Sequence, residues 1–307
     1  MKEDCLVSVI IPTYKRPLTL ERAINSCLNQ TYKNIEVIVI DDNNDGDEYR
    51  EETEKLMEKY AEDNKVIYIK HEKNMNGSAA RNTGIKKSKG KYIAFLDDDD
   101  EFLPDKIKRQ VERMESLDGT WGACYTGYRK EKNGVILEKG TEKREGNLKK
   151  QALMRTLYIS GGSNLLVRRN VVEEINGFDE SFKRNQDLEF LVRILDKYKL
   201  AYVNSCSLII HFDSRVANIT PEYMKEIDEL YLQSFKSEIE GMSIEDQNDF
   251  YTMKELDMFK LLLQKKRLIE AIKHIFDKKI NIFLLFKYIV YLIKRAITKE
   301  CYGFKFN

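Results

Sequence analysis

Residues 7–45 read VSVIIPTYKRPLTLERAINSCLNQTYKNIEVIVIDDNND, and this stretch decides the fold. Two apolar runs rich in Val and Ile, at 6–11 and 35–40, enclose a helical stretch at 18–29. Both runs are continuous rather than alternating, which is typical of strands buried on both faces of a parallel sheet. The stretch therefore predicts a strand-helix-strand unit with a right-handed crossover, the building block of an α/β fold.

The same alternation of strand and helix continues to about residue 118. A chain that repeats this unit predicts a Rossmann-like, mostly parallel sheet flanked by helices. Pro104 suits the first turn of one of these helices, because its fixed φ is already helical and its missing N–H is not needed there. Further strands are expected at 66–69 and 92–96, and further helices at 48–62, 78–88 and 104–117.

After residue 118 the regular alternation stops. The Asn133-Gly134 pair lies between two apolar runs, which predicts a hairpin. Thr220-Pro221 has the cap-then-proline pattern of a helix start, and the chain after it is expected to be helical. We therefore expect an α/β domain at 1–215, with halves at 1–118 and 119–215, and a helical region at 216–307. Strands are expected at 123–129, 135–138, 164–168 and 207–212, and helices at 148–158 and from 187 onward.

The composition excludes several classes of protein. Hydrophobic residues make up 42% of the 307 residues and charged residues 34%, with only 4 Pro and 15 Gly, which excludes a low-complexity or disordered chain. The 52 Lys and Arg nearly cancel the 51 Asp and Glu, so the broad positive field of a nucleic-acid binder is missing and no nucleic-acid partner is expected. Five scattered cysteines without a CxxC pair suit reduced thiols and predict no structural zinc site.

Polar residues follow each strand of the predicted parallel sheet. Pro12-Thr13-Tyr14 follows the first strand, Asp41-Asp42-Asn43 the second, Asn74 to Gly77 the third, and Asp97 to Asp100 the fourth. Ligands of an open parallel sheet bind beyond the carboxyl ends of its strands, where these loops converge. The sequence therefore predicts a binding site at this edge, with Arg81 at the start of the next helix facing an anionic ligand.

The four consecutive aspartates are the most informative of these loops. In an extended segment Asp97 and Asp99 would share one face, and Asp98 and Asp100 the other. Carboxylates this close repel one another, which raises their pKa unless a cation or hydrogen-bond donors compensate. Carboxylates, water and substrate phosphates together suit Mn²⁺ or Mg²⁺. An acidic loop that merely precedes a helix is the alternative, since Asp is favoured near a helix N-terminus.

No glycine-rich nucleotide-binding motif is present. The sequence has no GxGxxG after the first strand and no GxxxxGK[ST] anywhere, which argues against a dehydrogenase or a P-loop enzyme. A diphosphate at this edge would be held by a metal ion and by Arg81 or a helix N-terminus.

Six segments in this order resemble the family 2 glycosyltransferases, inverting enzymes of the GT-A fold that use nucleotide sugars. The resemblance covers roughly residues 5–212 and implies a nucleotide-binding half at 1–118 and an acceptor-side half at 119–215. The helical remainder resembles only the variable tails of such enzymes. The segments are VSVIIPTYKRP (7–17), IEVIVIDDNNDGD (35–47), GSAARNTGI (77–85), GKYIAFLDDDDEFLPDKI (90–107), LLVRRNVVEEINGFDE (165–180) and RNQDLEFLVRIL (184–195).

The resemblance implies roles for individual residues on the donor side. The loop of Pro12, Thr13 and Tyr14 looks like the one that cups a nucleobase, with Asp42 placed to hydrogen-bond a uracil. Asp97-Asp98-Asp99 resembles the DxD motif, in which the early aspartates face the ribose and Asp99 faces a metal ion on the diphosphate. The residues expected to bind the nucleotide sugar are Pro12, Thr13, Tyr14, Asp42, Asn76, Arg81, Asp97 and Asp98.

The resemblance also assigns a base and a second metal ligand. Asp187 sits where the family keeps its catalytic base, although the usual Glu-Asp pair is Gln186-Asp187 here. His211, at the end of the last predicted strand, resembles a histidine that completes the metal shell in some members. As alternatives, Asp187 could only cap its helix and His211 could be a hydrogen-bonded structural histidine.

These residues suit a single displacement. A divalent ion held by Asp99 would neutralise the charge that builds on the leaving diphosphate. Asp187 would take the proton of the attacking acceptor hydroxyl, which is worth roughly 10²–10⁴-fold in rate. An α-linked donor, expected to be a UDP-sugar, would then give a β-linked product on a saccharide, lipid-linked or wall-polymer acceptor. A nucleotidyltransferase and a catalytically silent sugar-nucleotide or glycan binding subunit are the alternatives.

The C-terminal region combines basic and apolar residues. Residues 251–307 hold 13 Lys and Arg against 5 Asp and Glu, around an apolar stretch at 280–293 that is too short to cross a bilayer. Such helices could lie on an anionic membrane, form a homo-oligomer, or pack against the rest of the chain. The apolar run before Pro12 is only six residues long, at 6–11, which is too short for a signal peptide, so a cytoplasmic protein is expected, with peripheral contact at the inner face of the membrane as an option.

Overall fold

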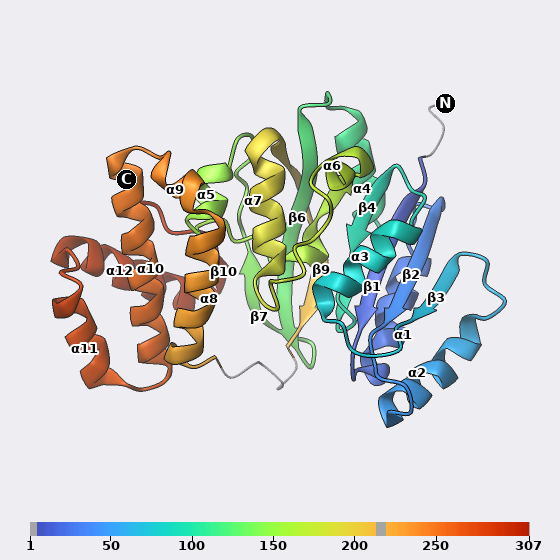
Figure 1. Cartoon of the computed structure of the whole chain (residues 1–307). Coiled ribbons are helices and arrows are strands. Elements are labelled where there is room, and N and C mark those ends of the chain that lie inside the picture. Colours follow the sequence, from blue (N-terminus) through green and yellow to red (C-terminus); the bar gives the residue numbers. More distant parts are fainter. Residues whose placement is uncertain (1–4, 213–218, 307) are drawn as a thin grey trace. The chain divides into compact units, whose positions relative to one another are not determined.

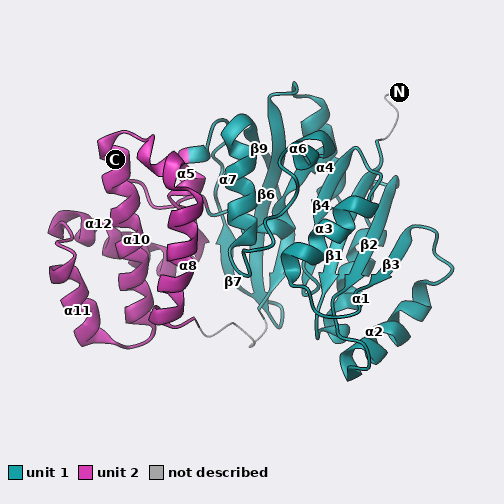
Figure 2. Cartoon of the chain, viewed as in Figure 1, with its two compact units in different colours: residues 1–149, 158–213 teal, residues 150–157, 214–307 magenta. Residues whose placement is uncertain are grey.

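The computed structural model describes residues 5–212 and 219–306 (Figure 1). The chain forms two compact units, shown in different colours in Figure 2: residues 1–149 with 158–213, and residues 150–157 with 214–307. Residues 150–157, expected within the α/β domain, therefore belong to the second unit. The predicted boundary at 215 falls within residues 213–218, outside the described part of the chain, and stays a prediction.

The first unit is built on the predicted parallel sheet. Its strands run in the order β7-β6-β8-β4-β1-β2-β3, and β1 pairs in parallel with both β2 and β4, while β2 pairs in parallel with β3. The β1, β2 and β4 strands are buried along almost their whole length, as their continuous apolar runs predict, but β3 is half-exposed because it lies at the sheet edge. The bounds are β1 Val7–Thr13, β2 Ile35–Asp41, β3 Val66–Lys70 and β4 Tyr92–Phe95.

Three helices connect these strands. Pro17 begins α1, Asp47 caps α2 by accepting a hydrogen bond from Tyr49 N, and Asn76 caps α3. After β3 the chain crosses to the other side of β1, so right-handed crossovers put α1 and α2 on one face of the sheet and α3 on the other. The strand order therefore reverses between β1 and β4, the point at which such sheets bind ligands. The bounds are α1 Pro17–Leu28, α2 Glu48–Met57 and α3 Gly77–Lys87.

The second half of this unit extends the sheet with antiparallel strands. β4 pairs with β8, β8 pairs with β6, and β6 forms the predicted hairpin with β7 through the Asn133-Gly134 turn, where both residues have positive φ. β9 runs parallel to β6 and also pairs with β5. The bounds are β5 Asp100–Phe102, β6 Trp121–Lys132, β7 Val135–Gly140, β8 Leu166–Arg168, β9 Lys199–His211, α4 Lys106–Glu115, α6 Arg169–Glu174 and α7 Gln186–Lys197.

Several predicted elements of this half differ from the structure. The helix expected at 148–158 is the short α5, Lys149–Leu153, because the chain takes a positive φ at Arg155. The strand expected at 207–212 begins at Lys199, eight residues earlier. The short strand β5 was not expected, because its first residue is the last aspartate of the acidic run. Asp has a low strand propensity, so the sequence does not predict a strand that begins at Asp100, and the pairing of β5 with β9 determines that strand.

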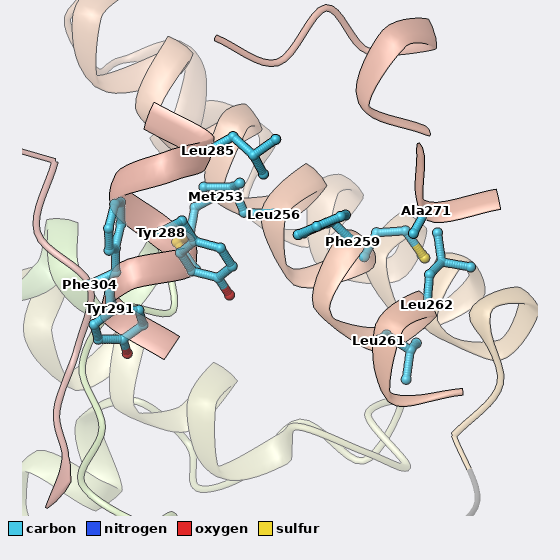
Figure 3. Packing of buried hydrophobic residues seen from close by; sticks show 11 residues of the cluster. Met253, Leu256, Phe259, Leu261, Leu262, Ala271, Leu285, Tyr288, Tyr291 and Phe304 are labelled. Carbon is cyan, nitrogen blue, oxygen red and sulfur yellow. The ribbon is translucent and has the colours of Figure 1, made fainter. Parts of the chain in front are cut away.

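The second unit is helical apart from a two-residue strand, β10. Its core is apolar, and Figure 3 shows Leu285, Tyr288 and Tyr291 of α12 packed with Met253 and Leu256 of α10. Among the described residues no helix is both long and apolar enough to cross a membrane. The bounds are α8 Pro221–Ser234, α9 Lys236–Glu240, α10 Ile244–Gln264, α11 Leu268–Asp277, α12 Ile282–Thr298 and β10 Glu300–Cys301.

Candidate active site

A cavity of about 390 Å³ lies at the carboxyl ends of β1, β2 and β4. It is where the predicted polar loops converge, and every residue expected to bind the nucleotide sugar lines it: Pro12, Thr13, Tyr14, Asp42, Asn76, Arg81, Asp97 and Asp98. Asn74 and Gly77, from a loop that was expected at this edge, also line the cavity, and four lining residues had no predicted binding role: Arg16, Ala80, Lys183 and Gln186.

Asp98 ties the loop after β1 to the loop after β4. Its Oδ2 accepts hydrogen bonds from Thr13 Oγ1 at 2.8 Å and Tyr14 N at 3.3 Å, and its Oδ1 lies 3.2 Å from Arg16 Nη1. Asp98 is 5% exposed, and burial raises its pKa to about 7, although Arg16 opposes the shift. Asp98 therefore shapes the cavity wall by joining two strand ends.

Asp97, Asp99 and Asp100 form a cluster, with carboxylate oxygens within 4.8 Å of one another. Asp97 and Asp99 lie together as expected, but Asp100 was expected on the other face and joins them, because Asp100 N donates a hydrogen bond to Asp97 O and the resulting turn brings Asp100 back beside Asp97. The pKa of Asp99 and of Asp100 is raised, first by burial and then by the neighbouring carboxylates. Burial, more than the expected mutual repulsion, is thus the larger cause.

Two arginines balance part of this negative charge. Arg16 Nη1 forms ion pairs with Asp98 and Asp99. Arg81 Nη2 lies 2.5 Å from Asp97 Oδ1, while its Nη1 donates to Gly77 O at 3.1 Å, and its guanidinium lies 5.6 Å from the centre of the Phe178 ring. Both guanidinium groups line the cavity, so they present positive charge to a ligand there. A third arginine, Arg22, donates from its Nη2 to Asp99 O at 2.6 Å, so three guanidinium groups contact this loop of four aspartates.

Ser163 holds the acidic loop by hydrogen bonds. It was not predicted as a site residue. Its Oγ accepts a hydrogen bond from Asp97 N at 3.0 Å, and a further hydrogen bond to Asp100 lowers the pKa of that carboxyl against the effect of burial. Ser163 lies in a short 3₁₀ turn, Gly162–Asn164, next to β8. The local signal for this segment is the Gly161-Gly162 pair before it, because glycines let another group approach the backbone closely.

Asp42 organises the loop after β3. Its two oxygens accept hydrogen bonds from His71 Nδ1 at 2.7 Å, Asn74 Nδ2 at 2.8 Å, Met75 N at 2.8 Å and Asn76 N at 3.1 Å. Asp42 is 2% exposed. It lines the cavity, but its acceptor positions are already engaged by the protein, so the contact with a uracil stays a prediction.

Asn76 lies at the N-terminus of α3 with a φ of +81°. Its side-chain oxygen accepts hydrogen bonds from Ser78 N at 2.9 Å and Ala79 N at 3.2 Å, and its Nδ2 donates to Glu180 O at 3.2 Å. The side chain therefore caps the helix that carries Arg81. A direct contact between Asn76 and a nucleotide sugar stays a prediction.

Asp187 lies within electrostatic reach of Arg81 and Asp97, so the predicted base and the acidic loop belong to one site. Burial raises its pKa, and the charge of Arg81 partly opposes that shift. Gly161 has a φ of +66°, and a Cβ at this position would collide with Asp187 Oδ2. The absence of a side chain at Gly161 thus leaves room for the carboxylate.

His211 does not belong to the acidic cluster found among the described residues. Its Nε2 lies 2.9 Å from Glu101 Oε2, one strand away on β5. The geometry therefore fits the alternative of a hydrogen-bonded histidine at a strand end, and its role as a metal ligand stays a prediction.

The acidic cluster fits a hard divalent cation. Three carboxylates supply oxygen ligands of the kind that Mn²⁺ and Mg²⁺ prefer, and they are close enough to share one ion. Two of them have a raised pKa, so a cation that stabilises their charged form would be bound favourably. Asp99 of the predicted metal ligands belongs to this cluster, together with Asp97 and Asp100, and the roles of Asp99 and His211 as metal ligands stay predictions.

Comparison with known proteins identifies relatives of this site and fold. The family model described as Glycosyl transferase family 2 matches residues 8–176. The chain is 39% identical over 131 residues to the Escherichia coli protein named UDP-Glc:alpha-D-GlcNAc-diphosphoundecaprenol beta-1,3-glucosyltransferase WfaP, covering 43% of this chain and 49% of that protein. It is 34–35% identical to three Rickettsia proteins named as uncharacterized glycosyltransferases, and spans 27–33% of their length.

Two solved structures share the fold. Staphylococcus aureus TarS in complex with UDP-GlcNAc superposes with a TM-score of 0.60 at 18% identity, covering 83% of this chain and 71% of that one. The mannosyltransferase PcManGT of Pyrobaculum calidifontis, in complex with GDP-Man and Mn²⁺, gives 0.59 at 17% identity, covering 88% and 75%. At this identity the likeness concerns the fold alone, and it confirms the predicted GT-A type α/β architecture.

Proposed function

The chain belongs to glycosyltransferase family 2, and on this premise we propose that it transfers a sugar from a UDP-sugar to a hydroxyl of a saccharide, lipid-linked or wall-polymer acceptor. The proposed reaction is a single displacement that inverts the anomeric centre and depends on a divalent ion. The observation that carries the proposal is that Arg81, Asp187 and the acidic cluster, which come from three distant parts of the sequence, lie in one site.

The relatives support the choice of substrates. WfaP is named for a UDP-linked donor, a diphosphoundecaprenol acceptor and a β-linked product. The TarS complex holds UDP-GlcNAc, and the PcManGT complex holds GDP-Man with Mn²⁺. A nucleotide sugar is therefore the common ligand class, and the UDP form is the proposal for this chain.

The cavity has the groups that a nucleotide sugar needs. Pro12, Thr13 and Tyr14 form the wall against which the nucleobase and ribose would pack. Arg81 and Arg16 would bind diphosphate oxygens, because guanidinium groups form charge-assisted hydrogen bonds with phosphate. Asp97, Asp99 and Asp100 would hold Mn²⁺ or Mg²⁺, which supplies a Lewis acid for the leaving diphosphate when bound.

Asp187 is the proposed base. Its raised pKa makes it a stronger proton acceptor than an exposed aspartate, and the missing side chain at Gly161 leaves room for its carboxylate. The proton of the hydroxyl would move to the carboxylate as the oxygen attacks the anomeric carbon. Arg81 is paired with Asp97 and its charge also acts on this carboxylate, so Arg81 would help to hold the diphosphate near the base.

The test measures UDP release from a panel of UDP-sugars, with Mn²⁺ or Mg²⁺ and after chelation. We expect release that depends on the ion and increases with a suitable acceptor. Pyrophosphate release would indicate nucleotidyl transfer instead and would contradict the proposal.

The Asp187→Asn variant separates binding from chemistry. It keeps the size of the side chain but removes the proton acceptor, so transfer to acceptor should fall by roughly 10²–10⁴-fold. Thermal stabilisation by UDP with Mn²⁺ should stay near that of the original chain, because the donor is held by other residues. As a matched control, Asp196→Asn changes an exposed carboxylate near the other end of the same helix and should leave the rate unchanged. An unchanged transfer rate for Asp187→Asn would remove this residue from the mechanism.

A further inference from the structure

Helix α12 has two apolar sides. One side, with Leu285, Tyr288 and Tyr291, is buried in the core of the second unit (Figure 3). The other side is solvent-exposed, with Phe283 at 83% and Ile297 at 77% exposure. At about 100° per residue, the exposed residues fall within an arc of about 100°, so they form one continuous stripe. They are Ile282, Phe283, Phe286, Val290, Ile293 and Ile297.

The preceding helix α11 repeats this arrangement. Only Ala271 is fully buried on it, while Leu268, Ile269, Ile272 and Phe276 are exposed, Ile269 at 85%. These four residues also follow helical spacing and share one stripe of the helix. Two consecutive helices of the same unit therefore each expose an apolar stripe, which is unusual for a surface that faces only water.

Basic residues border both stripes. Each stripe has lysines along the same edge, namely Lys273 on α11 and Lys287 and Lys294 on α12. Lys278 and Lys279 lie in the connection between the helices. The α12 sequence, IFLLFKYIVYLIKRAIT, contains no Asp or Glu. The stripe of α12 is thus bordered by positive charge alone, whereas α11 carries Glu270 and Asp277 as well as Lys273.

We propose that the exposed stripes of α11 and α12 are a docking surface for an anionic phospholipid bilayer. The apolar side chains would enter the boundary between headgroups and acyl chains, and the lysines would contact anionic headgroups. The helices would lie in the plane of the interface, because neither is long and apolar enough to cross the bilayer. If the proposed function is correct, the same placement would keep the chain at a membrane that carries a lipid-linked acceptor.

Charge distinguishes a bilayer from a second copy of the chain as the occupant. A symmetric dimer brings the same patch of both subunits together, so the lysines that border the stripes would face one another. An anionic lipid surface instead attracts each of these lysines, and each charge should raise the binding constant by about fivefold. The basic border therefore favours lipid.

The test is vesicle flotation of the full chain, without donor or acceptor, so that its outcome is independent of the proposed reaction. We expect the protein to float with vesicles of phosphatidylcholine and phosphatidylglycerol in equal parts, and poorly with phosphatidylcholine alone. Added salt should weaken the binding, because it screens the lysines. Absence of flotation with the anionic vesicles would overturn the proposal.

Two variants locate the contact. The double variant Phe283→Ser and Phe286→Ser removes exposed apolar side chains and should lower binding by roughly tenfold or more. The double variant Lys273→Gln and Lys294→Gln should lower binding to anionic vesicles alone, by about fivefold per charge. As matched controls in the same unit, Ile244→Ser, 79% exposed at the start of α10, and Lys225→Gln on α8 should float like the original chain.

Two results would contradict the assignment. The first is flotation that both double variants leave unchanged while circular dichroism shows intact folding. The second is a dimer of the original chain, seen by light scattering, that the Phe283→Ser and Phe286→Ser variant converts to a monomer. That outcome would assign the stripes to a second copy.

Discussion

Lys106 allows the strongest quantitative test of the packing beneath the active site. Its ammonium is fully buried at the first turn of α4, and its Nζ donates to Asn164 Oδ1 at 2.9 Å, Asn164 O at 3.3 Å and Thr126 Oγ1 at 3.4 Å. These three partners are neutral oxygens. Burial lowers the pKa of Lys106 to about 7. Asn164 follows Ser163 in the sequence, and Ser163 contacts the acidic loop, so Lys106 helps to hold the segment that positions this loop.

The sign of the pH effect follows from this lowered pKa. Below pH 7 both the folded and the unfolded chain carry the proton, and the full cost of burying the ammonium is present. Between pH 7 and the ordinary pKa of 10.5, the unfolded chain holds more protons, so the free energy of unfolding rises with pH. From pH 7 to pH 9 the rise should be about 2 kcal/mol, since one pKa unit corresponds to about 1.4 kcal/mol and Lys106 is half protonated at the start.

The perturbation is Lys106→Met, which keeps an unbranched side chain of similar length but cannot ionise. The acceptors it leaves keep other donors: Thr126 N and Oγ1 contact Asn164 Oδ1, and Gln110 Nε2 contacts Asn164 O. The variant should therefore fold, and its free energy of unfolding should not show the rise of about 2 kcal/mol between pH 7 and pH 9. The matched control, Lys108→Met, changes an exposed lysine of the same helix and should follow the original chain.

Urea unfolding at pH 7, 8 and 9 with reductant present measures this difference. Trp121 is the only tryptophan and lies on β6, so its fluorescence reports on the first unit alone. The reasoning is refuted if the original chain and Lys106→Met show the same pH slope, because Lys106 would then titrate alike in the folded and unfolded chain.

Three further substitutions test the site. Gly161→Ala places a Cβ against Asp187 Oδ2 at a residue with positive φ. The rate of sugar transfer should fall by roughly a hundredfold or more, while UDP should still raise the melting temperature. A normal transfer rate would show that the carboxylate does not need this space. Arg81→Gln removes the ion pair with Asp97 and a diphosphate contact, and should raise the donor KM by roughly 30-fold, corresponding to about 2 kcal/mol, with Arg81→Lys in between. Ser163→Ala removes a hydrogen bond to Asp97 N worth about 1 kcal/mol, and should raise the Mn²⁺ concentration for half-maximal activity by roughly fivefold; an unchanged requirement would mean that Ser163 does not position the acidic loop.

The sequence was most informative where local pattern and global fold coincide. Continuous apolar runs predicted β1, β2 and β4, because a strand buried on both faces has no polar alternate positions. Parallel strands end at the same edge, so the residues after them had to meet there. That is why Thr13, Asp42 and Asp98, distant in the chain, line one cavity as predicted.

The sequence says less about residues whose role depends on a partner. Asn76 and Asp42 line the cavity, and the structure adds that they cap a helix and hold a loop with hydrogen bonds of their own, while their contacts with a ligand stay predictions. Side chains of this type can bind either the backbone or a ligand, and the sequence does not show which donors lie nearby. His211 is similar, since only the pairing of β9 with β5 brings Glu101 to it.

By itself, the sequence determined the α/β class, the edge of the sheet that carries the site, and the acidic and basic residue types gathered there, because these follow from periodicity and from the direction of parallel strands. Only the tertiary structure decided that Arg16 pairs with Asp98 and Asp99, that Ser163 supports Asp97, and that Gly161 opens space for Asp187. The physical reason is that these contacts join segments 26 to 83 residues apart, and no local pattern encodes which side chain a distant turn will meet.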